Sequence, residues 1–139
     1  MATIGRQLRD AVRARSNGQC EYCQLPDAFS DEPFWIDHVV AEQHGGATRF
    51  ENLAFCCMRC NRQKGPNLAG RDPITNQLAF LFDPRKDTWN VHFEWASATL
   101  IGKTSVGRAT VVALNMNHPA RMSARAALVS EGVFPPSEI

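Results

Sequence analysis

The fold of this chain is decided by residues 20–65, which read CEYCQLPDAFSDEPFWIDHVVAEQHGGATRFENLAFCCMRCNRQKG. The stretch opens with Cys20-Glu-Tyr-Cys23, and a second C-x-x-C pair, Cys57-Met-Arg-Cys60, stands near its end. Residues 24–56, thirty-three in number, separate the two pairs, whereas a compact four-cysteine ribbon separates them by about 15–20. The spacing therefore predicts that a folded insertion lies between the two pairs.

The cysteines are best explained by a metal. Each C-x-x-C pair presents two thiolates from one tight turn, and four thiolates at about 2.3 Å satisfy a tetrahedral Zn²⁺ ion. The fifth cysteine, Cys56, would give the unmatched spacing C-x-x-x-C with Cys60, so we expect it to be a small buried packing residue. An odd number of cysteines argues against a disulfide framework, and no βαβ pattern supports a redox pair. The sequence predicts one structural zinc, with these ligands: Cys20, Cys23, Cys57 and Cys60.

Simple patterns around the two pairs predict the neighbouring elements. Residues 3–16 carry Ile4, Leu8 and Val12 at helical spacing, and Asn17-Gly18 ends that helix. β-branched and aromatic residues predict strands over residues 34–40 and 52–55. The second C-x-x-C pair opens a further helix that ends near Gly65-Pro66. Residues 1–65 are thus expected to form one α+β core.

The second half of the chain has a different composition. Residues 66–87 are rich in turn formers. Trp89, Val91, Phe93 and Trp95 alternate with polar residues, which predicts a strand whose apolar face is core rather than a platform for nucleobases. Helices are predicted from Thr104 onward and from near Asn117-His118-Pro119 to just before Gly132. Residues 66–139 are expected to be an extension that packs on the core.

The insertion between the two cysteine pairs carries several ordered motifs. They are Trp35-Ile-Asp-His-Val-Val40, Gly45-Gly46, Glu51-Asn-Leu-Ala-Phe55 and, across the second pair, C-x-x-C-Asn-x-x-Lys-Gly. In this order and spacing the sequence resembles the HNH endonuclease family over roughly residues 20–65. The resemblance implies a ββα-metal fold, in which a β-hairpin is followed by a helix, braced here by the four-cysteine zinc site.

The resemblance also implies the roles of individual residues. His38 would be the general base, Asp37 a ligand of a catalytic divalent metal, and Asn52 the residue that holds the hairpin loop and orients His38. Asn61 stands where many members have a last histidine, so the chain resembles an H-N-N variant. An amide oxygen at that position suits Mg²⁺ or Mn²⁺. The implied reaction is metal-dependent hydrolysis of phosphodiester bonds in DNA.

Strand geometry sets one condition on this site. Adjacent residues of a strand point to opposite faces, so Asp37 and His38 can share a site only if the strand ends or twists there.

Charge gives weaker information about the partner. The formal net charge is only +1, with 21% charged and 44% hydrophobic residues, as in a globular protein. Arginines crowd the first fifteen residues, and Arg59, Arg62 and Lys64 form a second basic cluster. These clusters can bind phosphates, and solvated helix faces explain them equally well. We expect contacts with nucleic acid from the second cluster and from His44.

Several alternatives stay open or are set aside. The main rival is a non-catalytic zinc module that binds nucleic acid or protein, and RNA is an open alternative substrate. His92-x-Glu94 matches part of a deaminase signature, but no P-C-x-x-C follows it, which excludes that activity. No apolar run approaches the roughly 20 residues that span a bilayer, and no signal-like segment opens the sequence, so a cytoplasmic location is expected.

Overall fold

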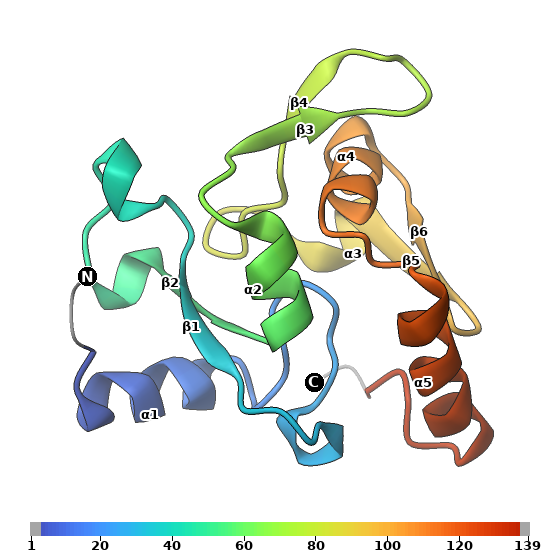
Figure 1. The fold of residues 1–139 in the computed structure, drawn as a ribbon, viewed down its shortest axis with the longest axis horizontal. Helices are drawn as coiled ribbons and strands as arrows, with labels where there is room; N and C mark the ends of the chain where they lie inside the picture. Colours follow the sequence, from blue (N-terminus) through green and yellow to red (C-terminus); the bar gives the residue numbers. More distant parts are fainter. Residues whose placement is uncertain (1–3, 137–139) are drawn as a thin grey trace. The chain divides into compact units, whose positions relative to one another are not determined.

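The computed structural model describes residues 4–136, and Figure 1 shows its elements. By the density of its internal contacts the chain divides into two compact units. Unit 1 consists of Met1–Pro66 and Asp83–Lys86, and unit 2 of Asn67–Phe82 and Asp87–Ile139. Unit 1 thus holds both cysteine pairs and a short segment that returns to it from later in the chain. The expectation that residues 66–139 pack on the core stays a prediction.

Unit 1 is built around a two-stranded antiparallel sheet. Strand β1 (Trp35–His38) pairs with β2 (Leu53–Cys56), with Trp35 opposite Cys56 and His38 opposite Leu53. Helix α2 (Met58–Lys64) follows β2 directly, and short 3-10 turns lie before and between the strands: η1 (Asp27–Phe29), η2 (Glu42–His44) and η3 (Phe50–Asn52). This β-hairpin followed by a helix confirms the predicted α+β fold.

Helix α1 (Arg6–Arg15) forms because its apolar residues recur at helical spacing, and Val12 is completely buried. The helix ends where Asn17 and Gly18 both adopt a positive φ. Arg15 donates to the carbonyl oxygens of Phe50 (2.7 Å) and Leu53, and its guanidinium lies 3.8 Å from the Phe50 ring centroid. The predicted helix is therefore confirmed, and one of its arginines serves to fix it beside η3 and β2.

Strand β2 forms the centre of the unit 1 core. All four of its residues are buried, and the Phe55 ring packs on Phe34 with centroids 5.1 Å apart. Cys56 is fully buried on this strand, in the packing position expected of it. A strand buried on both faces reads as a continuous apolar run, which explains why Leu53-Ala-Phe-Cys56 lacks alternation.

The described part of unit 2, residues 67–82 and 87–136, contains two β-hairpins and three helices. Strand β3 (Ala69–Arg71) pairs with β4 (Leu78–Phe80), and β5 (Phe93–Ala96) pairs with β6 (Thr99–Gly102). The helices are α3 (Trp89–His92), α4 (Ser105–Ala113) and α5 (Pro119–Ser130). Thr104 caps α4 and His118 caps α5, each through a side-chain acceptor for a backbone N–H. Both helices were predicted, and both begin where expected.

The alternating segment from Trp89 to Trp95 was only half correctly predicted. Residues 89–92 form α3, and the strand begins at Phe93. A helical turn brings Trp89 over Phe93 at i, i+4 spacing, with ring centroids 5.1 Å apart. This aromatic packing outweighs the period-two pattern, and Val91 is left 56% exposed. The β3–β4 hairpin falls in residues 66–87, which are rich in turn formers.

No helix in residues 4–136 is both long and apolar enough to cross a bilayer.

The loop after β1 yields a stability prediction. Gly46 packs so closely on Val40 that an added Cβ would lie 1.7 Å from the Val40 carbonyl oxygen. We expect Gly46→Ala to lower the free energy of unfolding by about 1–3 kcal/mol, as overpacking does, measured by urea denaturation. Gly5→Ala is the matched control, because nothing lies within 4 Å of a Cβ there. Equal stability of the two variants would contradict the tight packing of this loop.

Candidate functional site

Four cysteines that flank the β1–β2 hairpin in the sequence meet in one buried cluster. The sulfur atoms of Cys20, Cys23, Cys57 and Cys60 all lie within 4.8 Å of one another. In each pair the backbone N–H of the second cysteine donates to the sulfur of the first, at 3.5 Å for Cys23 and 3.4 Å for Cys60. The two turns therefore have the same local geometry. The four cysteines named from the sequence are the four that meet, and Cys56 is outside the cluster.

The cluster has the dimensions and the chemistry of a tetrahedral thiolate site. The sulfurs of Cys23 and Cys57 are 3.7 Å apart, and four ligands at about 2.3 Å from a central ion lie about 3.8 Å from each other. Burial raises the pKa of Cys20 and of Cys60 well above the usual thiol value. Four thiolates crowded together without water need a cation among them. The donor set thus fits a structural Zn²⁺ ion.

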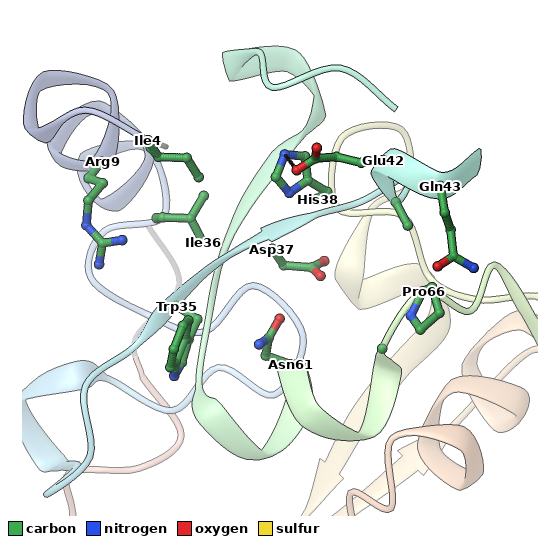
Figure 2. Close-up of a pocket in the computed structure, with 12 residues that line it drawn as sticks. Ile4, Arg9, Trp35, Ile36, Asp37, His38, Glu42, Gln43, Asn61 and Pro66 are labelled. Atoms are coloured by element: carbon green, nitrogen blue, oxygen red, sulfur yellow. Dashed lines mark ion pairs between the residues drawn. The ribbon is translucent and has the colours of Figure 1, made fainter. Parts of the chain in front are cut away.

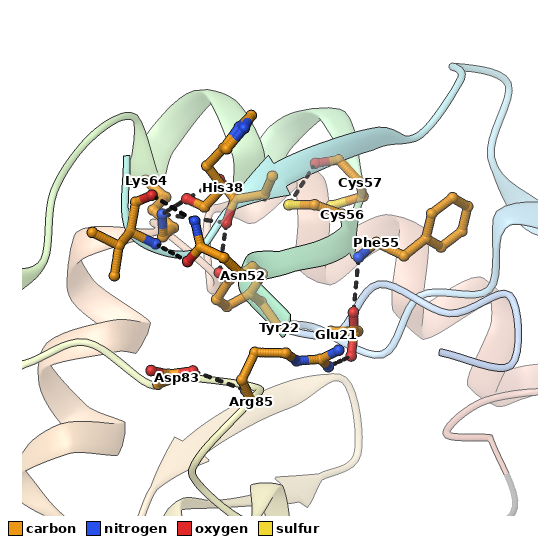
Figure 3. Close-up of polar contacts among 12 residues, drawn as sticks. Glu21, Tyr22, His38, Asn52, Phe55, Cys56, Cys57, Lys64, Asp83 and Arg85 are labelled. Carbon is orange, nitrogen blue, oxygen red and sulfur yellow. Dashed lines mark hydrogen bonds and ion pairs between the residues drawn. The ribbon is translucent and has the colours of Figure 1, made fainter. Parts of the chain in front are cut away.

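Polar contacts tie the first cysteine pair to its surroundings (Figure 3). Glu21, inside the Cys20–Cys23 turn, accepts a hydrogen bond from the backbone N–H of Phe55 at 2.8 Å. Its other carboxylate oxygen pairs with Arg85, which belongs to the segment that returns to unit 1. The backbone N–H of Arg85 donates to the Asp83 carboxylate at 2.8 Å. This segment therefore helps to hold the first pair against β2.

An open pocket of about 480 Å³ lies in front of β1. Residues from the start of the chain, from β1, from the loop around η2 and from α2 line it, and Asp37, His38 and Asn61 are all among them. Figure 2 shows that Asp37 and Asn61 lie on one side of the strand, whereas the His38 ring points to the other side, toward Glu42. Asp37 and Asn61 thus lie on one side of β1 and His38 lies on the other side. All three residues line the same pocket.

Asp37 is fixed by two buried partners. The Tyr22 hydroxyl donates to its Oδ2 at 2.7 Å, and the Lys64 ammonium lies 3.3 Å from Oδ1 and 3.2 Å from Oδ2. Tyr22 is completely buried, and Lys64 and Asp37 are 2% and 5% exposed. Burial raises the pKa of Asp37, and the Lys64 ammonium and the Tyr22 hydroxyl act in the opposite direction. Tyr22 from the first cysteine turn and Lys64 from α2 therefore fix the orientation of the Asp37 carboxylate together.

His38 is held by the residues that follow it. Its Nε2 lies 2.9 Å from the Thr48 hydroxyl and 3.5 Å from the Glu42 carboxylate, four residues on. Lys64 also donates to the backbone carbonyl of His38 at 3.2 Å. The side chain of His38 is 16% exposed. The imidazole is thus oriented but still accessible from the pocket.

Asn52 fixes the loop between the two strands. Its Oδ1 accepts from the N–H of Val40 at 2.9 Å, and its Nδ2 donates to the carbonyls of Val40 (3.0 Å) and Ala47 (2.9 Å). It therefore spans the loop that carries Glu42 and Thr48 to His38. That Asn52 orients His38 during a reaction stays a prediction.

Asn61 enters the pocket from α2, next to the second cysteine pair. Within residues 4–136 its side-chain amide makes no hydrogen bond, and Figure 2 shows it pointing toward the side of β1 that carries Asp37. A free amide oxygen and a carboxylate on the same side of a strand form a set of hard oxygen donors. Oxygen donors of this kind are the ligands that Mg²⁺ and Mn²⁺ prefer, and the binding of such an ion by Asp37 and Asn61 stays a prediction.

The basic residues differ in availability. Lys64 was expected to contact nucleic acid, but its ammonium is buried against Asp37 and is not accessible to a phosphate in this structure. Arg59, Arg62 and His44 are exposed, and their contacts with nucleic acid stay predictions. Arg13, in α1, is paired with Asp27 at 2.8 Å.

Sequence reasoning missed several residues of this site. Tyr22 carries no signal beyond its place between two cysteines. Glu42 is four residues after His38 and contacts it from η2. The short, polar sequence of η2 did not predict a 3-10 turn that brings the two side chains together. Arg9 was noted only as part of a basic cluster, and the structure places it at the pocket.

Comparison with known proteins gives an independent result. The family model described as HNH endonuclease matches residues 20–67, a range that includes both cysteine pairs and the pocket residues of β1 and α2. No solved structure matches the chain.

Two curated proteins are similar to this chain. The Septu protein PtuB of Bacillus thuringiensis is 27% identical over 117 residues, which are 83% of this chain and 43% of that protein. The CRISPR-associated endonuclease Cas9 of Corynebacterium diphtheriae is 44% identical over 52 residues, 37% of this chain and 5% of that protein. The chain thus spans less than half the length of either relative.

The cysteine cluster generates a prediction about metal content. We expect one zinc ion per chain, measured by elemental analysis of the purified protein. Cys23→Ser should lose it and unfold or aggregate, because the free energy of binding a structural zinc contributes directly to folding.

Cys56→Ser is the matched control, since Cys56 is equally buried but outside the cluster. It should keep its zinc. Loss of zinc from this variant, or a wild-type protein without zinc, would contradict the ligand set.

Proposed function

We propose, from the membership of residues 20–67 in the HNH endonuclease family, that this chain is a metal-dependent DNA endonuclease. In this proposal His38 is the general base, Asp37 and Asn61 hold a catalytic Mg²⁺ or Mn²⁺ ion, and a zinc ion on the four cysteines maintains the fold. The family is described as HNH endonuclease, which implies cleavage of nucleic acid in general.

The observation that carries the proposal is that Asp37, His38 and Asn61 all line one pocket, Asp37 and Asn61 from one side of β1 and His38 from the other. Each residue comes from a different position of the ββα element, and each has the donor or acceptor atoms that phosphodiester hydrolysis requires. A carboxylate and an amide supply oxygen ligands, and an imidazole with a reference pKa of about 6.5 accepts a proton near neutral pH.

The chain's own residues have separable tasks in this reaction. A divalent ion bound at the site would supply charge stabilisation on the phosphoryl oxygens. His38 takes the proton of the attacking water, with Glu42 and Thr48 holding its ring. Tyr22 and Lys64 hold the Asp37 carboxylate in place. Asn52 keeps the loop closed behind His38.

The buried ion pair also favours a nuclease over a non-catalytic zinc module. Burying a carboxylate and an ammonium together costs desolvation energy that well-packed apolar residues would avoid. A module that only binds a partner gains nothing from Asp37 and Lys64 at 5% and 2% exposure. A catalytic site does, because its chemistry needs a carboxylate that is held in a fixed orientation.

The general base gives the first test of this function. His38→Ala should lower the rate of nicking of supercoiled plasmid by roughly 10²–10⁴-fold with Mg²⁺ or Mn²⁺ present. Zinc content and DNA binding should be retained, because the four cysteines and the proposed DNA contacts are unchanged, although the ring's contacts with Thr48 and Glu42 are lost.

His118→Asn serves as the control for histidine removal. His118 caps α5 in unit 2, and asparagine is also a good helix cap, so this variant should cut at the parental rate. A folded His38→Ala protein that nicks at the parental rate would overturn the mechanism and favour the zinc binding module.

The proposed metal ligands give the second test. Asn61→Ala should reduce cleavage as deeply as His38→Ala, but the loss should be partly recovered by raising the concentration of Mn²⁺. Asn61→His should restore partial activity with an altered metal preference, since imidazole favours softer ions than an amide oxygen does. The measurement is a metal titration of the single-turnover rate. An unchanged metal dependence in Asn61→Ala would remove this residue from the ligand set.

A further inference from the structure

We propose that the pocket in front of β1 binds one unpaired nucleotide of the DNA strand, with its base on Trp35 and a flanking phosphate on Arg9. This inference rests on the proposed function and extends it by naming the form of DNA that the site takes.

Trp35 is exposed in a way that the other tryptophans are not. It is 47% exposed, and within residues 4–136 its indole ring makes no hydrogen bond and no ring contact. The remaining two of the three tryptophans stack on each other, Trp89 and Trp95, with ring centroids 6.0 Å apart. An indole left open on the wall of a pocket offers a large, flat, apolar surface. A nucleobase is a matching partner because every base has a π-face.

The position of Trp35 relates its ring to the proposed chemistry. Trp35 and Asp37 are two residues apart on β1, so their side chains share a face about 7 Å apart along the strand. Figure 2 shows the Trp35 ring and the Asn61 amide on the side of β1 that carries Asp37, and all three residues line the pocket. A base stacked on Trp35 therefore belongs to a nucleotide that flanks a phosphate held near Asp37 and Asn61.

Arg9 offers the pocket a positive charge that can bind a phosphate of the same DNA strand. Arg13 and Arg15 of α1 are committed to contacts within unit 1, whereas Arg9 is exposed, lines the pocket and has no ion pair in the described part of the chain. A guanidinium can bind phosphate oxygens in a bidentate manner. Ile4 and Ile36 lie near Arg9 and leave an apolar lining next to the charge (Figure 2).

The combination selects an unpaired nucleotide. In a duplex both faces of each base are covered by its neighbours, so an indole cannot reach a base unless that base leaves the stack. The pocket volume of about 480 Å³ is in the range of sites that enclose a small ligand. A stacked base contributes roughly 1–3 kcal/mol by alanine substitution, which corresponds to about 5- to 150-fold in affinity. Trp35 is thus a residue that determines which DNA structure is bound.

The test measures binding by the full chain carrying His38→Ala, so that the DNA stays intact. Three labelled duplexes are compared: one with a single unpaired nucleotide, one with an abasic unit at that place, and one fully paired. Trp35→Ala should weaken binding of the first duplex by about 5- to 150-fold and leave the other two unchanged. Trp35→Phe should keep most of the affinity. Arg9→Ala should weaken the unpaired and abasic duplexes alike, because it removes a phosphate contact.

Phe80→Ala is the matched control, since Phe80 is an aromatic residue of unit 2 with 75% exposure. It should change none of the three affinities. Binding of the unpaired nucleotide should also quench tryptophan fluorescence, and Trp35→Phe should abolish that quenching. Equal effects of Trp35→Ala on all three duplexes, or no effect on any, would overturn the inference.

The two proposals fail separately. A wild-type protein that cleaves DNA while Trp35→Ala binds normally refutes the nucleotide site and leaves the nuclease intact. A protein that cuts no DNA with any metal, yet binds unpaired nucleotides through Trp35, refutes the nuclease and leaves the nucleotide site intact.

Discussion

Everything in the ββα element depends on the meeting of four thiols. Cys20 and Cys23 lie before the hairpin and Cys57 and Cys60 after it, so bringing them together closes a long stretch of chain on itself. Closing so long a loop costs chain entropy, and the hairpin alone is too small to offset it. A cation bound by the four thiolates would supply the missing free energy. The positions of the pocket residues on β1 and α2 depend on this closure.

The same closure sets the electrostatics of the candidate active site. Tyr22 is part of the first cysteine turn, and Lys64 ends the helix that begins at the second. Both reach Asp37, so the carboxylate is positioned by the two halves of the thiol cluster. His38 is on the opposite side of the strand and depends instead on Glu42, Thr48 and the loop held by Asn52. The proposed ligand and the proposed base are thus oriented by different parts of the fold.

Local patterns in the sequence predicted much of this arrangement, because the decisive features are local. Two C-x-x-C turns fix their own geometry, and Thr104 and His118 cap helices with residues three or fewer positions away. The failures have a tertiary cause. Residues 89–92 follow a strand pattern but form a helical turn, since Trp89 packs on Phe93. Lys64 looked like a surface cation, and only the three-dimensional pairing with Asp37 shows that it is buried. Strand alternation predicted that Asp37 and His38 lie on opposite sides of β1, but not that both residues line one pocket, because that depends on the shape of the pocket.

The central claim is that two metals act in separate roles, with zinc supporting the fold and a hard divalent ion supporting cleavage. The most direct measurement follows nicking of supercoiled DNA by zinc-loaded protein, first without added metal and then across a Mg²⁺ and Mn²⁺ series, with zinc content measured in each sample. The account predicts no cleavage by the zinc-loaded protein alone and cleavage that rises and saturates with Mg²⁺ or Mn²⁺ at constant zinc. Cleavage that is independent of added metal, or none under any condition, would contradict it.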